Sequence, residues 1–127
     1  MYDTVMEGLK VRLIKGPESM AADNPFVNVV VVSMEGRRID DFTQRNIDYL
    51  MRNRKGIAFL EKGEIDISAI SARWFTYTKT QDGVTRDMIN YIIPVKGFAY
   101  MITCGINAGR MDKYRSTFDK IARSFKE

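Results

Sequence analysis

The chain of 127 residues contains no histidine. This absence excludes zinc sites built on histidine, Ser–His and Cys–His nucleophile pairs, and acid–base catalysis by an imidazole. A glycine-rich phosphate loop is missing too, because Gly105 and Gly109 fit neither the GxGxxG nor the Walker pattern. We therefore expect no cofactor and no catalytic site of these kinds.

Cysteine is nearly absent as well. The single cysteine, Cys104, rules out an internal disulfide bond. It ends an apolar strand and has no cation close to it in the sequence. We therefore expect a small buried side chain rather than a reactive thiol.

The sequence also lacks a strong charge of one sign and a membrane segment. Its 20 basic and 16 acidic residues give a net charge of +4, which is too balanced to predict nucleic-acid binding. It has no apolar run long enough to span a membrane, and the opening MYDTVMEG has neither the basic nor the apolar region of a signal peptide. The compartment stays open between a cytoplasmic protein and one that is exported or lipid-anchored after removal of an N-terminal signal.

The part of the sequence that organises the rest is the segment 71–104, which predicts consecutive antiparallel strands at about 71–79, 85–93 and 98–104. Asp82-Gly83 and Lys96-Gly97 separate these strands and are typical of tight hairpin turns. Side chains alternate between the two faces of a strand. Both faces of the middle strand are apolar, so we expect the sheet to be covered on both faces.

Helices and strands on either side complete the prediction. A segment with four consecutive valines, 26–34, is expected to form a strand buried on both faces. Asp40 is expected to cap a helix at about 40–54 whose stripe of Phe42, Asn46, Tyr49 and Leu50 faces the sheet. Further strands are expected at 9–14, 57–60 and 64–68, a turn at Lys62-Gly63, and a second amphipathic helix at 110–125.

This order of elements predicts an α+β fold. We expect a loose segment at 1–8 and then a single domain at 9–127. The domain is predicted to be an α/β/α sandwich, with a mainly antiparallel sheet of about six to seven strands and two main helices.

The same elements resemble the PsbP-like superfamily, over nearly the whole chain. The resemblance is carried by the helix start IDDFTQRNIDYL, the segment GIAFLEKGEIDISAISARWFTYT, the Asp82-Gly83 hairpin, the segment YIIPVKGFAYMIT and the closing FDKIARSF. It implies an α/β/α sandwich that serves as a binding or accessory module of unassigned role. Many bacterial relatives are exported or lipid-anchored, whereas this chain shows no signal or lipobox cysteine, and the metal and photosystem contact residues of the plant branch have no matching motif here.

Aromatic and basic residues are the candidates for a partner or ligand surface. The aromatic residues lie on neighbouring predicted strands, and strand aromatics of this kind also pack in a core. The basic residues follow the first helix, where they can bind an anion or stabilise the helix end. The same surface could instead seal a homodimer. The candidates are Trp74, Tyr77, Tyr91, Tyr100, Arg52, Arg54 and Lys55.

Acidic residues crowd the predicted turn at 61–66. Glu61, Glu64 and Asp66 are a weak candidate for a cation site, because they lack the spacing and number of oxygen ligands of an EF-hand. The alternative interpretation is a solvated turn.

These observations favour a non-enzymatic binding or accessory protein that acts through contact with a partner protein. A carrier of a small ligand or metal ion is the alternative. A hydrolase built on carboxylates is weaker, since no two carboxylates are placed to face one cavity.

Overall fold

The computed structural model describes residues 3–6, 9–12, 25–53 and 55–125. Their elements, in chain order, are β1 (Asp3–Met6), β2 (Leu9–Arg12), β3 (Phe26–Ser33), α1 (Ile39–Asn53), β4 (Ile57–Ile67), β5 (Ile70–Gln81), β6 (Val84–Val95), β7 (Phe98–Asn107) and α2 (Met111–Arg123).

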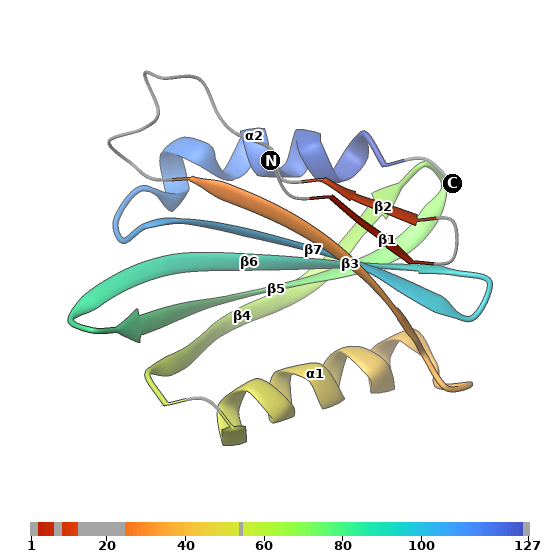
Figure 1. Cartoon of the computed structure of the whole chain (residues 1–127), viewed down its shortest axis with the longest axis horizontal. Helices are drawn as coiled ribbons and strands as arrows, with labels where there is room; N and C mark the ends of the chain where they lie inside the picture. The colour runs from red at the N-terminus through yellow and green to blue at the C-terminus, as the bar shows by residue number, and fades with distance from the viewer. Residues whose placement is uncertain (1–2, 7–8, 13–24, 54, 126–127) are drawn as a thin grey trace.

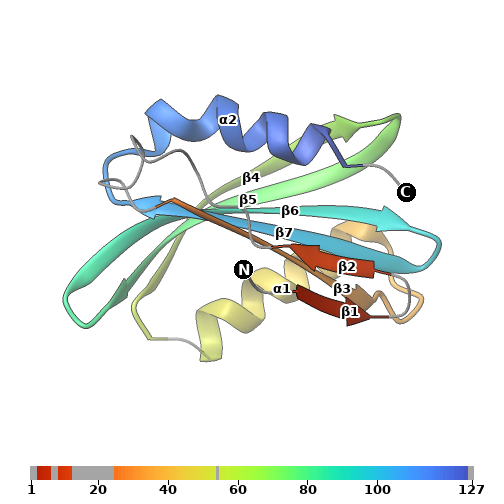
Figure 2. The same ribbon diagram turned by 45° about the horizontal axis from the view of Figure 1, so that its top comes forward.

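The main sheet has five antiparallel strands in the order β3-β7-β6-β5-β4. Figure 1 shows α2 on one face of this sheet and α1 on the other, and Figure 2 shows the same three layers after rotation. The predicted single-domain α+β sandwich is therefore confirmed, with fewer strands in the main sheet than the expected six to seven. Within the described residues, neither helix is long and apolar enough to cross a membrane.

Each face of the sheet packs against its own helix. Ile89, Tyr91 and Ile93 of β6 belong to a core cluster with α2, whereas Met88 and Ile92 belong to a second cluster with α1. We call the two sides of the sheet the α2 face and the α1 face. The period-two alternation of apolar residues in β5, β6 and β7 predicted this division, because both faces are buried.

The predicted hairpin turns are confirmed. Asp82 and Gly83 both have positive φ, as do Lys96 and Gly97, which is the conformation that two-residue hairpin turns require. The turn between β4 and β5 was not predicted as a hairpin of this kind. It also has two residues of positive φ, Ser68 at 50° and Ala69 at 67°, although neither is a glycine.

The predicted turn at Lys62-Gly63 is wrong, because β4 runs through it without a break. Gly63 is instead required by packing, because a Cβ atom there would lie 2.5 Å from Cζ2 of Trp74. The glycine thus lets the indole ring lie across the β4 backbone. The register of β4 shifts at Leu60, where the strand carries a bulge.

Three smaller expectations also differ from the structure. Asp3–Met6 of the segment expected to be loose forms β1, which pairs with β2 in a separate two-stranded sheet. The strand β7 extends to Asn107, beyond the expected end at about residue 104, so Gly105 lies inside it. Asp40 lies in the first turn of α1 rather than at its cap.

Candidate functional site

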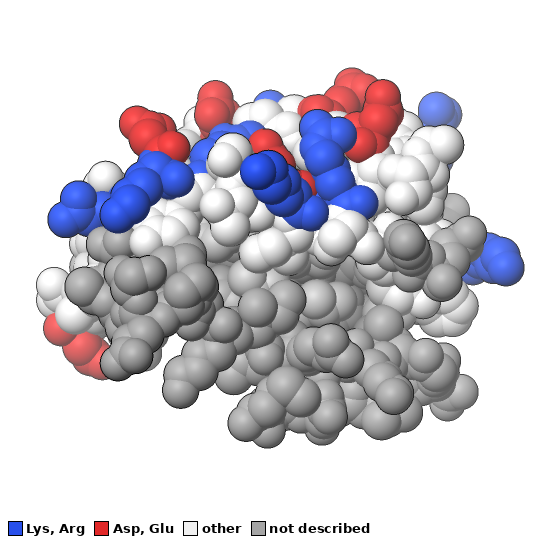
Figure 3. All heavy atoms as spheres, turned by 90° about the horizontal axis from the view of Figure 1, so that it is seen from above, with Lys and Arg blue, Asp and Glu red and all other residues white. Residues whose placement is uncertain are grey.

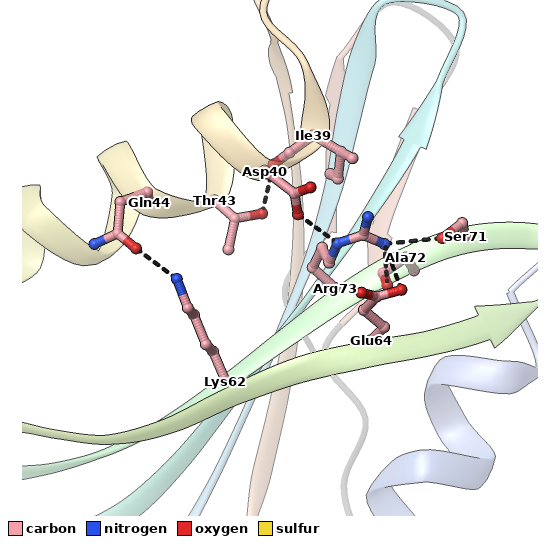
Figure 4. A network of polar contacts seen from close by, with 9 residues as sticks. All are labelled: Ile39, Asp40, Thr43, Gln44, Lys62, Glu64, Ser71, Ala72 and Arg73. Atoms are coloured by element: carbon pink, nitrogen blue, oxygen red, sulfur yellow. Dashed lines mark hydrogen bonds and ion pairs between the residues drawn. The ribbon is translucent and has the colours of Figure 1, made fainter.

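A partly buried arginine connects α1 to the β4–β5 side of the sheet (Figure 4). Arg73 of β5 has a side chain that is only 13% exposed, and its Nε donates to Oδ1 of Asp40 in α1 at 2.7 Å. Its Nη1 donates to Oγ of Ser71 at 2.8 Å and lies 3.9 Å from Oε1 of Glu64. The hydrogen bond from Arg73 lowers the pKa of the Asp40 carboxyl. This carboxylate therefore stays charged and bonded to the strand below.

A second contact holds the same helix to β4. Nζ of Lys62 donates to Oε1 of Gln44 at 2.8 Å, as Figure 4 shows. With the Arg73 contact it places α1 over β4 and β5, which are the strands that α1 mainly packs against. The helix is thus displaced toward one edge of its face.

The other half of the α1 face leaves large apolar side chains exposed. Val30 and Val32 of the edge strand β3 are 38% and 39% exposed, and they pair with Met101 and Ala99 on the α1 face of β7. Tyr49 on α1 is 57% exposed. Two sequence expectations are corrected here, since the valine segment is not buried on both faces and Tyr49 does not pack into the core.

A pocket of about 250 Å³ lies between the end of β3 and α1. Met34 and Phe42 give it apolar walls, and Arg37 and Arg45 lie 3.4 and 3.6 Å from the shared carboxylate of Asp41. Ser33, Glu35, Asn46 and Tyr49 complete the lining. We call Val30, Val32 and the lining of this pocket the β3–α1 surface.

Asn46 belongs to the stripe that was expected to face the sheet. Its Nδ2 donates to the carbonyl oxygen of Phe42 within α1 at 2.8 Å. The amide is therefore satisfied inside its own helix and forms part of the pocket wall.

The predicted aromatic surface is divided between the two faces. Tyr77 is buried on the α1 face, whereas Trp74, Tyr91 and Tyr100 lie on the α2 face. Tyr91 is fully buried, and the ring of Tyr100 packs edge-on against Phe125 at 4.8 Å. These four residues pack in the core and do not form a common surface. Packing in a core was the alternative interpretation of the strand aromatics.

Two neighbouring polar side chains of α2, Asp119 and Arg115, contact Tyr91 and Trp74. The Tyr91 hydroxyl donates to the Asp119 carboxylate, and Nε of Arg115 donates to the same carboxylate at 3.4 Å. The Arg115 guanidinium lies 4.5 Å from the centre of the Trp74 ring. Burial, reinforced by Asp119, raises the pKa of Tyr91. The phenol therefore stays protonated and ties α2 to the sheet.

The basic candidates lie at the end of α1. Arg52 is exposed in its last turn, where its Nε approaches the carbonyl oxygen of Asp48 at 3.5 Å, and Lys55 is exposed just beyond it. Arg54 lies outside the described residues. Arg52 and Lys55 stand where cations stabilise the negative end of a helix dipole.

The acidic candidates do not converge. In the strand register, Glu64 lies opposite Arg73 and Asp66 lies opposite Ser71, so both acidic residues are on the α1 face. Glu61 lies opposite Thr76 and therefore points to the other face. Across the parts of the chain that the structure describes, no three acidic or cysteine side chains gather in a way that could hold a metal ion.

Figure 3 looks down on the α2 side of the molecule and shows basic side chains in a row, with acidic side chains beside them. The described basic residues of α2 are Lys113, Arg115, Lys120 and Arg123, and its acidic residues are Asp112 and Asp119. Charges of both signs are thus mixed on this helix, as on an ordinary solvated surface.

Comparison with known proteins finds one family and several similar structures. The family model for PsbP-like proteins matches residues 15–127. No curated protein matches the chain in sequence.

Three of the solved structures that share the fold have 10–15% sequence identity to this chain. A Pseudomonas aeruginosa protein of unknown function, suggested to be a regulator, has a TM-score of 0.76 and 10% identity, covering 100% of this chain and 96% of its own. The cyanobacterial PsbP of Synechocystis sp. PCC 6803 has a TM-score of 0.60 and 15% identity, covering 81% and 67%. LpqN, which is involved in cell envelope biogenesis of Mycobacterium tuberculosis, has a TM-score of 0.59 and 11% identity, covering 93% and 70%.

Proposed function

Because this chain belongs to the PsbP-like family, we propose that it is a non-enzymatic accessory protein that binds a partner protein through its β3–α1 surface. Of the three similar structures, one is a suggested regulator, one is a cyanobacterial PsbP and one is a protein involved in cell envelope biogenesis. None of these descriptions names a reaction. They support a fold that acts through contacts.

The observation that carries the proposal is the exposed apolar group of Val30, Val32 and Tyr49 beside the 250 Å³ pocket. Exposed apolar side chains that gather around a concavity mark interaction sites more often than isolated ones do. Tyrosine, arginine and methionine are the residue types enriched in the centres of protein interfaces. Tyr49, Arg37, Arg45 and Met34 bring all three types to this surface.

The non-enzymatic part of the proposal rests on which reactive groups the chain contains. It has no histidine, and its cysteine is buried in the core. Carboxylates such as Asp40 and Asp119 are engaged with arginines. Turnover of any substrate that is lost when one polar residue is changed would overturn this part.

The test is a pull-down after mild crosslinking from cells that make the protein, with partners identified by mass spectrometry. The wild type is compared with Val32→Lys and Tyr49→Ala. The matched control is Leu60→Lys, because Leu60 is 58% exposed on β4, the opposite edge of the sheet. We expect a stoichiometric partner that both β3–α1 variants lose and the control retains.

Two results would overturn the partner surface. The first is a partner that Val32→Lys and Tyr49→Ala still bind at wild-type level. The second is a protein that sediments as a dimer and becomes monomeric in Val32→Lys, because a second copy of the chain would then occupy the surface.

A second candidate function, the carrier of a small ligand, is favoured by a separate pocket at the other end of the α1 face. A metal ion is not part of this candidate, because the acidic residues at 61–66 point to different faces of β4.

A further inference from the structure

A pocket of about 290 Å³ opens on the α1 face near the β5–β6 turn. Its apolar lining is Phe26, Val84 and Met88, and its charged lining is Lys79, Arg86 and Asp82. Phe26 and Ser33 stand at opposite ends of β3. At about 3.3 Å per residue, this pocket lies roughly 20 Å from the pocket of the β3–α1 surface.

Two cations face each other across the strands of this pocket. Lys79 of β5 and Arg86 of β6 are direct partners in the antiparallel register, and both line the pocket. Like charges directly opposite in a sheet destabilise the pair. Among the described residues no carboxylate forms an ion pair with Lys79.

The position of Arg86 is built by its neighbours. Its guanidinium lies 5.1 Å from the centre of the Phe26 ring, and its Nη1 donates to Oδ1 of Asn107 at 3.3 Å. The ring itself rests on a glycine, because a Cβ at Gly105 would lie 2.3 Å from Cε1 of Phe26 and 2.8 Å from Sδ of Met88. The absence of a side chain at Gly105 thus leaves room for the Phe26 ring, and this ring contacts the Arg86 guanidinium.

Partial burial of this arginine has a cost, since desolvation lowers the pKa of Arg86. An anion placed between the two cations would form charge-assisted hydrogen bonds with both Lys79 and Arg86. The adjoining apolar side chains would at the same time contact an apolar group.

We propose that the Lys79–Arg86 pocket binds a carboxylate that is attached to a small apolar body. Arg86 and Lys79 bind the two oxygens of the carboxylate, and Phe26, Val84 and Met88 contact the apolar part. Asp82, the acidic residue of the lining, opposes the anion. The site is independent of the β3–α1 surface and of any partner protein there.

The direct test is a titration of the ¹⁵N-labelled protein with 3-phenylpropionate, followed by amide chemical shifts. The neutral 3-phenylpropan-1-ol is the control ligand. We expect shifts centred on residues 79–88 with the acid and much weaker ones with the alcohol. Binding should also weaken as salt is raised, because the cations are partly exposed.

Three variants test the charges. Lys79→Gln should weaken binding of the acid roughly tenfold, whereas Asp82→Asn should strengthen it by removing a like charge. Lys120→Gln is the matched control, because Lys120 is an exposed lysine on α2, on the other side of the sheet. Thermal melting of each variant confirms that it is folded.

A further arm identifies the source of the carboxylate. The peptide acetyl-Gly-Gly-Phe is titrated with a free and with an amidated C-terminus. Shifts at 79–88 with the free peptide assign the pocket to the C-terminus of a chain, and shifts with phenylpropionate alone assign it to a free acid. The proposal is overturned if neither acid shifts these amides, if the alcohol binds equally well, or if Lys79→Gln binds like the wild type.

Discussion

Replacing Gly63 with alanine should destabilise the fold by forcing Trp74 from its place. The new Cβ would lie 2.5 Å from Cζ2 and 2.7 Å from Cε2 of the indole ring, well inside van der Waals contact. The indole ring has little room to move, because it lies on the α2 face of the sheet, where the Arg115 guanidinium is 4.5 Å from the centre of the ring. The backbone at Gly63 is not left-handed, so the cost arises from packing alone.

The magnitude follows from two opposing effects. Inserting a methyl group into a packed region costs about 1–3 kcal/mol. Alanine also reduces the entropy of the unfolded chain relative to glycine, which returns about 0.4–1 kcal/mol. The difference is a net loss of roughly 0–2.6 kcal/mol. Because the new Cβ would lie within 3 Å of two ring atoms, we expect a value of about 1–2 kcal/mol in the free energy of unfolding. For a domain of 127 residues this lowers the Tm by roughly 3–10 °C.

The assay is urea denaturation followed by far-UV circular dichroism. Gly97→Ala is the control, because Gly97 has a φ of 83° and open space around its Cβ position. It should lose stability through backbone strain and leave Trp74 in place. Trp74 is the single tryptophan, so its emission spectrum should change in Gly63→Ala and stay unchanged in Gly97→Ala.

A double-mutant cycle decides whether the two residues are coupled. If the ring causes the loss, Gly63→Ala should cost much less in a Trp74→Leu background, with a coupling energy of about 1 kcal/mol. Additive losses, or an unchanged emission spectrum in Gly63→Ala, would refute the steric explanation.

Three further predictions concern the turns and the core. Ala69→Gly should raise the free energy of unfolding in urea by about 0.5–1 kcal/mol, because it relieves a left-handed alanine at φ 67°; a loss would contradict this. Burial raises the pKa of the Cys104 thiol to about 12. The unfolded chain therefore releases a proton above about pH 9 that the folded chain keeps, so stability should fall with rising pH by up to about 1.4 kcal/mol per unit. Urea denaturation at pH 8.5 and 10 should show a smaller fall in Cys104→Ala, and an equal fall would disprove it. Tyr91→Phe should lower stability by about 1–2 kcal/mol, because it removes a hydrogen bond to the charged Asp119; a neutral effect in the same assay would show that this bond is dispensable.

Local sequence signals predicted the central meander well. Asp82-Gly83 and Lys96-Gly97 were recognisable as turns because two adjacent residues determine the backbone there. The alternation in β6 predicted which residues face each helix, because a strand buried on both faces still obeys period two. These features depend on neighbours in the sequence.

Other features depend on residues that are distant in the sequence, and for these the predictions from local patterns were wrong. Lys62-Gly63 has the composition of a turn, but its glycine accommodates an indole from the next strand. Val30 and Val32 belong to a run that indicates burial, yet β3 is an edge strand. Strand order decides that exposure, and no local pattern of the valines reveals it.

The candidate surfaces were missed for the same reason. Tyr49 belongs to the apolar stripe of α1, and a stripe alone places it toward the core. Its exposure follows from where α1 sits on the sheet, which a hydrogen bond between Arg73 and Asp40 helps to determine across 33 residues of sequence.

The two faces of the sheet thus differ in how their helices are placed. α2 packs against β4, β6 and β7, which spreads its contacts over most of the sheet, whereas α1 mainly packs against β4 and β5. The displaced position of α1 leaves the β3 side of its face open at both ends. The β3–α1 surface lies at one end and the Lys79–Arg86 pocket at the other. Binding is therefore to be sought on the α1 face, and variants on α2 such as Lys120→Gln are its natural controls.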